Sequence, residues 1–409
     1  MPLKREMVGM DNTMQRKYNA LHATYWMGTL CALGFVAVLL QHKGLTNTEI
    51  GVVTGGSSLT TIVLSPVVSG VCAKVKRFSL QQQLIGFFAV ESLLFSAIVF
   101  LPLPKALLMG LYIAMYALNI STVPLVSTIA MNYIADGKPV NFGLSRGIGS
   151  ISYALCAIVA GQLVGWFSPA ALGFLFLGAN ILCVVVLWRM PATYSKTEAK
   201  ADCAASVSLF GLAGRYRLFF GLLLGFGLAF AASACVGTYL INIVTSLGGD
   251  ASMLGVATFF MAASELPVMA VAPRLMHRFG AKSLLAAAAL FYIARNGLVC
   301  VAPSLPVLFV GLAFQGLSYG LFTPIMTYYV AENLAKEHQI MGQTMIGVMT
   351  SGFGSAIGNT AGGMLQDAYG METMLRFVLA LTLAGALMVV SLRQAGKKQN
   401  VPQLAKESN

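Results

Sequence analysis

Charged residues are scarce in this 409-residue sequence. Asp, Glu, Lys and Arg make up 10% of it, whereas they supply about a quarter of an ordinary soluble domain. The 7 cysteines show no paired spacing, so neither a disulfide framework nor a metal site is indicated. The phosphate-cradling pattern Gly-x-x-x-x-Gly-Lys-Ser/Thr is missing, which leaves ATP-driven chemistry without support. With no nucleophile–base motif either, we expect no enzyme and no cofactor.

Apolar residues are abundant instead, at 57% of the chain, and they gather in segments of about 20 residues. An α-helix of that length crosses the hydrocarbon core of a bilayer. The segments lack the alternating pattern of barrel strands, so helices that satisfy their own backbone hydrogen bonds are expected. The sequence predicts an all-α membrane protein with twelve transmembrane helices, near 20–41, 50–72, 80–101, 106–130, 142–167, 169–188, 218–244, 252–274, 283–302, 306–330, 340–364 and 373–392.

The formal charge of +12 is unevenly distributed between the two sides of these spans. With the N-terminus inside the cell, only Lys43, Lys105 and Arg376 fall in outer connections. This bias follows the positive-inside rule and predicts a multi-pass protein of the inner (plasma) membrane with both termini in the cytoplasm. The basic surplus is therefore an orientation signal, and no nucleic-acid partner is expected. The first span lacks a small-residue cleavage site and is interpreted as a retained helix.

The longest polar stretch separates six predicted spans from six. We therefore expect an N-terminal six-helix bundle at 1–189, a cytoplasmic linker at 190–217, and a C-terminal six-helix bundle with its tail at 218–409. The halves echo each other, because short basic turns follow the second and the eighth span, at 69–77 and 273–282. Two pseudo-symmetric halves with binding near the midplane describe one large transporter architecture.

Two local patterns predict structure only. Thr46-Asn-Thr-Glu49 reads as a capping box at the start of the second span. Glycines spaced by four residues in the eleventh span indicate close helix packing, at Gly354, Gly358 and Gly362.

Four charged residues lie inside the apolar spans: Glu91, Arg146, Glu265 and Arg295. A charge at such depth costs about 2.5–3.5 kcal/mol even on the mildest scale, so it persists mainly where it faces a partner or a watery cavity. Glu265 falls ~20 Å from its span's outer end, where a carboxylate can take up and release a proton as access alternates. Arg295 is about as deep, and its expected charge partner is Glu265 or Glu91, as a structural or a gating pair. The alternative for Glu265 is a purely structural charge neutralised by Arg295.

Arg146, Ser150 and Tyr153 stand at i, i+4 and i+7 of the fifth span, which places them on one helical face. A cation, a hydroxyl and an aromatic ring on one stripe suit a polar ring-shaped ligand. The alternative is that Arg146 snorkels to the cytoplasmic edge. Further polar residues inside the spans are candidates for a central cavity, although each could serve packing instead: His22, Tyr25, Trp26, Asn119, Thr128, Gln315, Tyr319 and Asn359.

The chain resembles the major facilitator superfamily. The two basic turns resemble its signature, with Ala73 and His277 in place of the usual Asp. Within the superfamily the chain is similar to the lactose permease-like group, which carries sugars, nucleosides and aromatic acids with protons. That similarity spans the whole sequence and rests on residues 44–51, 142–149, 263–267 and 315–322.

The resemblance implies substrate binding by Arg146, Ser150 and Tyr153 and proton coupling by Glu265. At two places the sequence differs from lactose permease, and these differences limit the substrates and the coupling residues that the resemblance implies. Thr128 stands where lactose permease has a glutamate for the sugar, and Gln315 and Ser318 align with its His-x-x-Glu pair. Galactoside specificity is therefore not expected, and coupling would rest on Glu265 or Glu91.

We expect a monomeric secondary transporter that works by alternating access in the lipid bilayer. Its partners would be a proton and a small polar organic solute, namely a nucleoside, a non-galactoside sugar or an aromatic carboxylate, carried by symport. The alternative is a drug/proton antiporter, although the stretch 161–165 lacks the proline of that group's signature.

Overall fold

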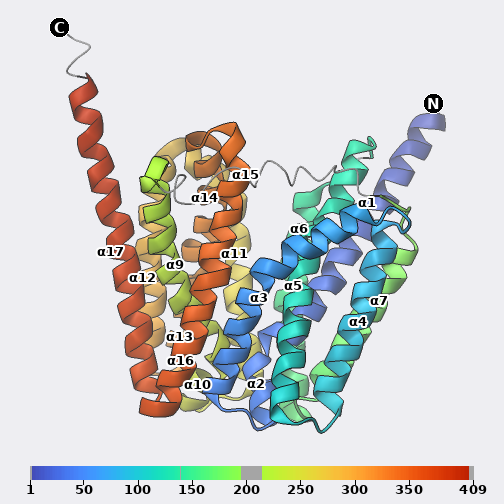
Figure 1. Cartoon of the computed structure of the whole chain (residues 1–409), viewed down its shortest axis with the longest axis horizontal. Coiled ribbons are helices and arrows are strands. Elements are labelled where there is room, and N and C mark those ends of the chain that lie inside the picture. Colours follow the sequence, from blue (N-terminus) through green and yellow to red (C-terminus); the bar gives the residue numbers. More distant parts are fainter. Residues whose placement is uncertain (1, 139, 195–213, 405–409) are drawn as a thin grey trace. The chain divides into compact units, whose positions relative to one another are not determined.

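The computed structural model describes residues 2–138, 140–194 and 214–404. Side chains are described throughout these ranges except at residues 2–12, 340 and 393–404. Every regular element in these ranges is a helix (Figure 1). The predicted linker, 190–217, lies largely outside the described residues.

Packing divides the chain into two compact units, Met1–Ala201 with Gly248–Phe259, and Asp202–Leu247 with Phe260–Asn409. The first unit contains α1 (Pro2–Thr29), the π-helix η1 (Leu30–Gly34), α2 (Val36–His42), α3 (Asn47–Lys74), α4 (Leu80–Phe100), α5 (Lys105–Ala135), α6 (Phe142–Trp166) and α7 (Ala171–Trp188). The second contains α9 (Arg217–Thr238), α10 (Leu240–Ser246), most of α11 (Ala251–Phe279), α12 (Ala281–Cys300), α13 (Leu305–Ala313), the π-helix η3 (Gly316–Gly320), α14 (Leu321–Asn333), α15 (Lys336–Gly347), the π-helix η4 (Val348–Gly354), α16 (Ser355–Tyr369) and α17 (Met371–Leu404).

The described helices account for the twelve predicted spans. Ten helices are long and apolar enough to cross a membrane, and Thr13–Gly34 with Val36–His42 makes an eleventh span bent by 49°. The twelfth is the unbroken run of α15, η4 and α16, whose many Gly, Ser and Thr residues lower its hydropathy. The predicted all-α, twelve-helix fold is confirmed.

The first and seventh spans break at corresponding places. The break after η1 falls at Phe35 (φ −114°, ψ 25°), and the break between α9 and α10 falls at Tyr239 (φ −100°, ψ 19°). The backbone dihedral angles of these two residues lie outside the α-helical region, and a short helix follows each of them. The halves thus share a local feature that their hydropathy does not reveal.

The turns after these short helices also correspond. Gly44 (φ 82°) and Gly248 (φ 79°) adopt the left-handed conformation that favours glycine. Thr46 then caps α3, since its hydroxyl accepts from the Glu49 N–H at 3.2 Å and its own N–H donates to Glu49 Oε2 at 2.8 Å. The predicted capping box is confirmed. Asp250 stands at the corresponding position before α11, where its Oδ1 accepts from Met253 N–H at 3.1 Å.

Each unit has its own core. In the first, α1 packs on α6 and α7, and α4 packs on α5 and α7. In the second, α9 packs on α16 and α17, and α12 packs on α13, η3 and α14. Large apolar side chains also face outward, including Leu93 (72% exposed), Phe167 (76%) and Trp188 (83%). Such an exterior suits contact with lipid.

Glycine allows near-contact of backbones in the second unit. A Cβ on Gly358 would overlap the carbonyl of Ala231, and one on Gly354 would lie 2.8 Å from the carbonyl of Gly227. The close packing predicted from the glycine spacing is confirmed, because α9 leaves no room for a side chain at either position.

Candidate functional site

Arg146 and Ser150 share a face of α6, as their spacing predicts. Arg146 Nη1 donates to Ser150 Oγ at 3.1 Å. The guanidinium carbon lies 4.1 Å from the ring centroid of Trp26 on α1, a close cation–π contact. The ring of Tyr153 meets the same indole edge-on, with centroids 6.4 Å apart. Arg146 is exposed and the other three are partly buried, so the group forms an accessible surface between α1 and α6.

The position of Trp26 depends on a glycine. A Cβ on Gly149 would lie 2.4 Å from Trp26 Cδ1 and 3.3 Å from the carbonyl oxygen of His22. The absence of a side chain at this position therefore lets the indole lie against α6. Asn141 fixes the start of that helix, since its Oδ1 accepts from the Leu144 N–H at 2.9 Å.

Behind this surface lies a buried polar network. Tyr25 donates its hydroxyl to the Asn119 carbonyl at 2.7 Å, and Thr29 donates to Asn119 Oδ1 at 3.3 Å. The Asn119 amide in turn donates to Glu91 Oε2 at 3.0 Å. Glu91 is 0% exposed, and its Oε1 has no hydrogen-bond partner among the described residues. The structure thus brings Tyr25, Asn119 and Glu91 together around one amide.

Thr128 lies further along α5. Its hydroxyl donates back to the Pro124 carbonyl at 2.8 Å, a bond within its own helix. Among the described residues, no hydrogen bond joins Thr128 to the network around Asn119.

In the second unit, Glu265 and Gln315 are directly bonded. Gln315 Nε2 donates to Glu265 Oε1 at 3.1 Å. The helices that carry them approach closely, because a Cβ on Gly316 would overlap the Ser264 carbonyl, and the Gly316 N–H donates to Ser264 Oγ at 3.0 Å. α11 runs unbroken through Pro267 at this point. Gln315, the residue directly before the π-helix η3, therefore lies against the carboxylate.

Arg295 is 0% exposed in the core of the second unit. Its Nη1 donates to Ser233 Oγ at 2.8 Å and to Asn296 Oδ1 at 2.6 Å. Where the sequence suggests an ion pair with Glu265 or Glu91, the hydrogen bonds go to these neutral groups, and Glu265 acts on Arg295 only as a nearby charge. Its Nε and Nη2 have no hydrogen-bond partner among the described residues.

Tyr319 belongs to the same region. Its ring lies 5.7 Å from that of Phe230, centroid to centroid, and Tyr319, Glu265 and Arg295 all act electrostatically on the buried Tyr292. The four candidates of the second unit, Glu265, Arg295, Gln315 and Tyr319, are therefore neighbours.

The sequence of this chain matches a known protein family. A sequence model of the MFS_1 like family matches residues 18–377. The chain belongs to this family of the major facilitator superfamily. The predicted superfamily is confirmed, and the protein is a multi-pass membrane transporter.

Two curated relatives match this transporter over about two thirds or more of its length. The maltose permease of Geobacillus stearothermophilus is 27% identical over 294 residues, 71% of this chain and 73% of the permease. The uncharacterised transporter YwbF of Bacillus subtilis (strain 168) is 23% identical over 284 residues, 69% of this chain and 70% of YwbF.

Solved structures agree on the fold. A mutant of the nucleoside transporter NupG aligns with a TM-score of 0.76 at 16% identity, covering 93% of this transporter and 98% of NupG. A mutant of the peptide transporter POT in complex with alafosfalin aligns with a TM-score of 0.72 at 12% identity, covering 94% of each chain. Likeness at such identity shows the fold alone.

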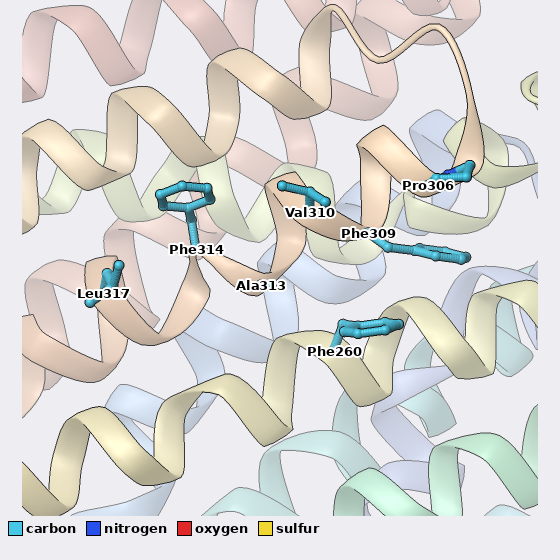
Figure 2. A pocket seen from close by; sticks show the side chains of 7 residues that line it. All are labelled: Phe260, Pro306, Phe309, Val310, Ala313, Phe314 and Leu317. Carbon is cyan, nitrogen blue, oxygen red and sulfur yellow. The ribbon is translucent and has the colours of Figure 1, made fainter.

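An open pocket of about 410 Å³ between α11 and α13 is lined by apolar side chains (Figure 2). The rings of Phe260 and Phe309 stack there with centroids 5.6 Å apart. The wall is completed by Pro306, Val310, Ala313, Phe314 and Leu317. A lining of this kind offers no group that could orient a polar solute, so we do not assign the solute site to it.

Trp26 was expected only as one of several cavity candidates, and its contact with Arg146 was not predicted. Ser233 and Asn296 were not predicted as the partners of Arg295. Each contact joins positions far apart in the chain or depends on a rotamer.

Proposed function

We propose that the protein is a proton-coupled symporter that carries a small sugar other than a galactoside into the cell. It would lie in the inner membrane with both termini in the cytoplasm. The likeness to a maltose permease favours a sugar over a nucleoside or an aromatic carboxylate as solute.

Substrate recognition would rest on the α6 face. The planar guanidinium of Arg146 can donate to two oxygens at once, which suits the paired hydroxyls of a sugar. Ser150 adds a hydroxyl, and Trp26 and Tyr153 add aromatic surface beside it.

The observation that carries the coupling proposal is the hydrogen bond from Gln315 to Glu265. It holds a carboxyl group in the middle of α11, far from either end of the helix. An amide N–H can donate to the carboxyl in either protonation state, so Glu265 can gain or lose a proton without losing this partner. Arg295 provides positive charge nearby.

The test is transport by the purified protein in liposomes. We expect an imposed pH gradient, acidic outside, to drive accumulation of radiolabelled maltose, with protons entering together with the sugar as reported by an internal pH dye. Uridine and benzoate serve as the competing solute classes.

Two results would contradict the proposal. Maltose uptake that only equilibrates, whatever the gradient, would identify a facilitator. Protons leaving as the solute enters would identify the alternative, an antiporter.

A further inference from the structure

Two buried nitrogen atoms on α1 face the candidate substrate surface without a partner. Trp26 Nε1 and His22 Nδ1 have no hydrogen-bond partner among the described residues. His22 is 2% exposed and uses its other ring nitrogen toward the Tyr18 hydroxyl at 2.9 Å. Buried polar groups are normally paired, so two such atoms one helical turn apart point to a ligand.

Both residues lie against the same stretch of α6. Gly149 leaves room for the edge of the indole and lies next to the backbone of His22. Arg146 covers the indole at 4.1 Å from its centroid and acts electrostatically on His22. The guanidinium of Arg146, the indole of Trp26 and the backbone of His22 thus meet at one stretch of α6.

The chemistry of these groups selects a class of ligand. The guanidinium and the indole N–H are donors, whereas a neutral imidazole can donate or accept at Nδ1. A ligand that satisfies all three needs several hydroxyls, each both donor and acceptor. It also needs an apolar face to lie on the indole once the guanidinium moves aside, and a sugar ring has both.

We propose that Trp26 is a substrate-contacting residue that holds Arg146 on its indole until a sugar arrives. The guanidinium of Arg146 then donates hydrogen bonds to the sugar hydroxyls, and the C–H face of the sugar ring replaces the guanidinium on the indole. Trp26 Nε1 and His22 Nδ1 gain hydroxyl groups of the sugar as hydrogen-bond partners. The choice of a sugar rests on the proposed function, whereas the role of Trp26 rests on its contacts.

The fluorescence of Trp26 can report whether a solute is bound against it. The other two tryptophans, Trp166 and Trp188, are 71% and 83% exposed. Replacing both by Phe leaves Trp26 as the only indole. We expect its emission to shift saturably when the purified double variant is titrated with maltose, and to stay constant with benzoate or uridine. No response to any of the three solutes would overturn the role of Trp26. A response only to uridine or benzoate would overturn the choice of a sugar.

A second measurement uses transport. Trp26→Phe retains an aromatic face for Arg146 but lacks the N–H, so we expect the KM for maltose to rise about tenfold, the effect of one ordinary hydrogen bond. Trp188→Phe is the matched control, with a KM within about twofold of the wild type. Equal KM values in the two variants, both monodisperse by size exclusion, would refute a contact with the N–H. Maltose-dependent emission without proton-driven accumulation would refute the proposed coupling and leave the role of Trp26 intact.

Discussion

Arg146 on α6 stacks on the indole of Trp26 on α1, with the guanidinium carbon 4.1 Å from the ring centroid. The contact brings a guanidinium of α6 onto an aromatic ring of α1. It requires a planar cation, and several expectations depend on that shape.

Arg146→Lys should weaken solute binding although the charge is retained. An ammonium neither stacks on an indole as a plane nor donates in a fork, and loss of one bidentate contact lowers affinity by about tenfold or more. Binding is measured by calorimetry on the purified protein. Arg376→Lys is the control, because that arginine is exposed and pairs with Glu372 at 2.5 Å. Equal affinity in both variants would favour snorkelling for Arg146.

Glu265→Gln should abolish accumulation driven by a pH gradient while counterflow exchange of solute continues. The amide retains the shape and a hydrogen-bond acceptor for Gln315 but cannot carry a proton. Radiolabelled solute in liposomes measures both activities. Glu372→Gln, at an exposed site on α17, controls for loss of a carboxylate. Continued accumulation in the Glu265 variant would move the coupling role to Glu91.

Glu91 should tolerate Gln better than Leu. Gln retains an acceptor for the Asn119 amide, now bonded to Glu91 Oε2 at 3.0 Å, whereas Leu leaves that buried N–H unpaired at a cost of about 1–3 kcal/mol. Thermal unfolding of the purified variants shows the difference. Similar melting temperatures for Gln and Leu would mean that the Asn119 amide finds another acceptor.

Gly316→Ala should destabilise the second unit by about 1–3 kcal/mol, because the new methyl group would overlap the Ser264 carbonyl and backbone cannot move aside cheaply. Gly297→Ala is the matched control in α12, where a Cβ meets nothing within 4 Å. There the higher helix propensity of Ala should add up to about 1 kcal/mol of stability. Thermal unfolding that moves both variants in the same direction would contradict this reasoning.

Orientation can be tested with a pair of single cysteines. If the basic bias is interpreted correctly, Lys76→Cys should react with a membrane-impermeant reagent only from the cytoplasmic side, and Lys43→Cys only from the outside. Right-side-out and inverted vesicles supply the two sides. Labelling of both positions from one side would refute the twelve-span topology.

Sequence reasoning worked where the determinant is local. The capping box of Thr46 and Glu49 spans one helical turn, and the shared face of Arg146 and Ser150 follows from helical periodicity. The twelve spans follow from runs of about 20 apolar residues, including the Gly-, Ser- and Thr-rich run that forms α15, η4 and α16.

Sequence reasoning worked less well for the hydrogen-bond partners of buried charged side chains. Depth in the membrane suggested that Arg295 needs a carboxylate, yet Ser233 and Asn296 accept its hydrogen bonds. Which neutral oxygens surround a buried guanidinium depends on how α9 and α12 pack. No spacing along the chain encodes that arrangement, and the stacking of Arg146 on Trp26 was hidden for the same reason.

The π-helices of the first, tenth and eleventh spans have a consequence for how this sequence can change. A π-turn accommodates one residue more than the α-helix around it, so η1, η3 and η4 each resemble an inserted residue absorbed in place. Removing one residue from an α-helix turns everything beyond it by about 100°, which would misplace a whole core face. Removing one from Gly316–Gly320 could instead restore regular α-helix, with α14 keeping its register to α12. A single-residue deletion within one of these three short segments should therefore disturb the fold less than a deletion elsewhere in the spans.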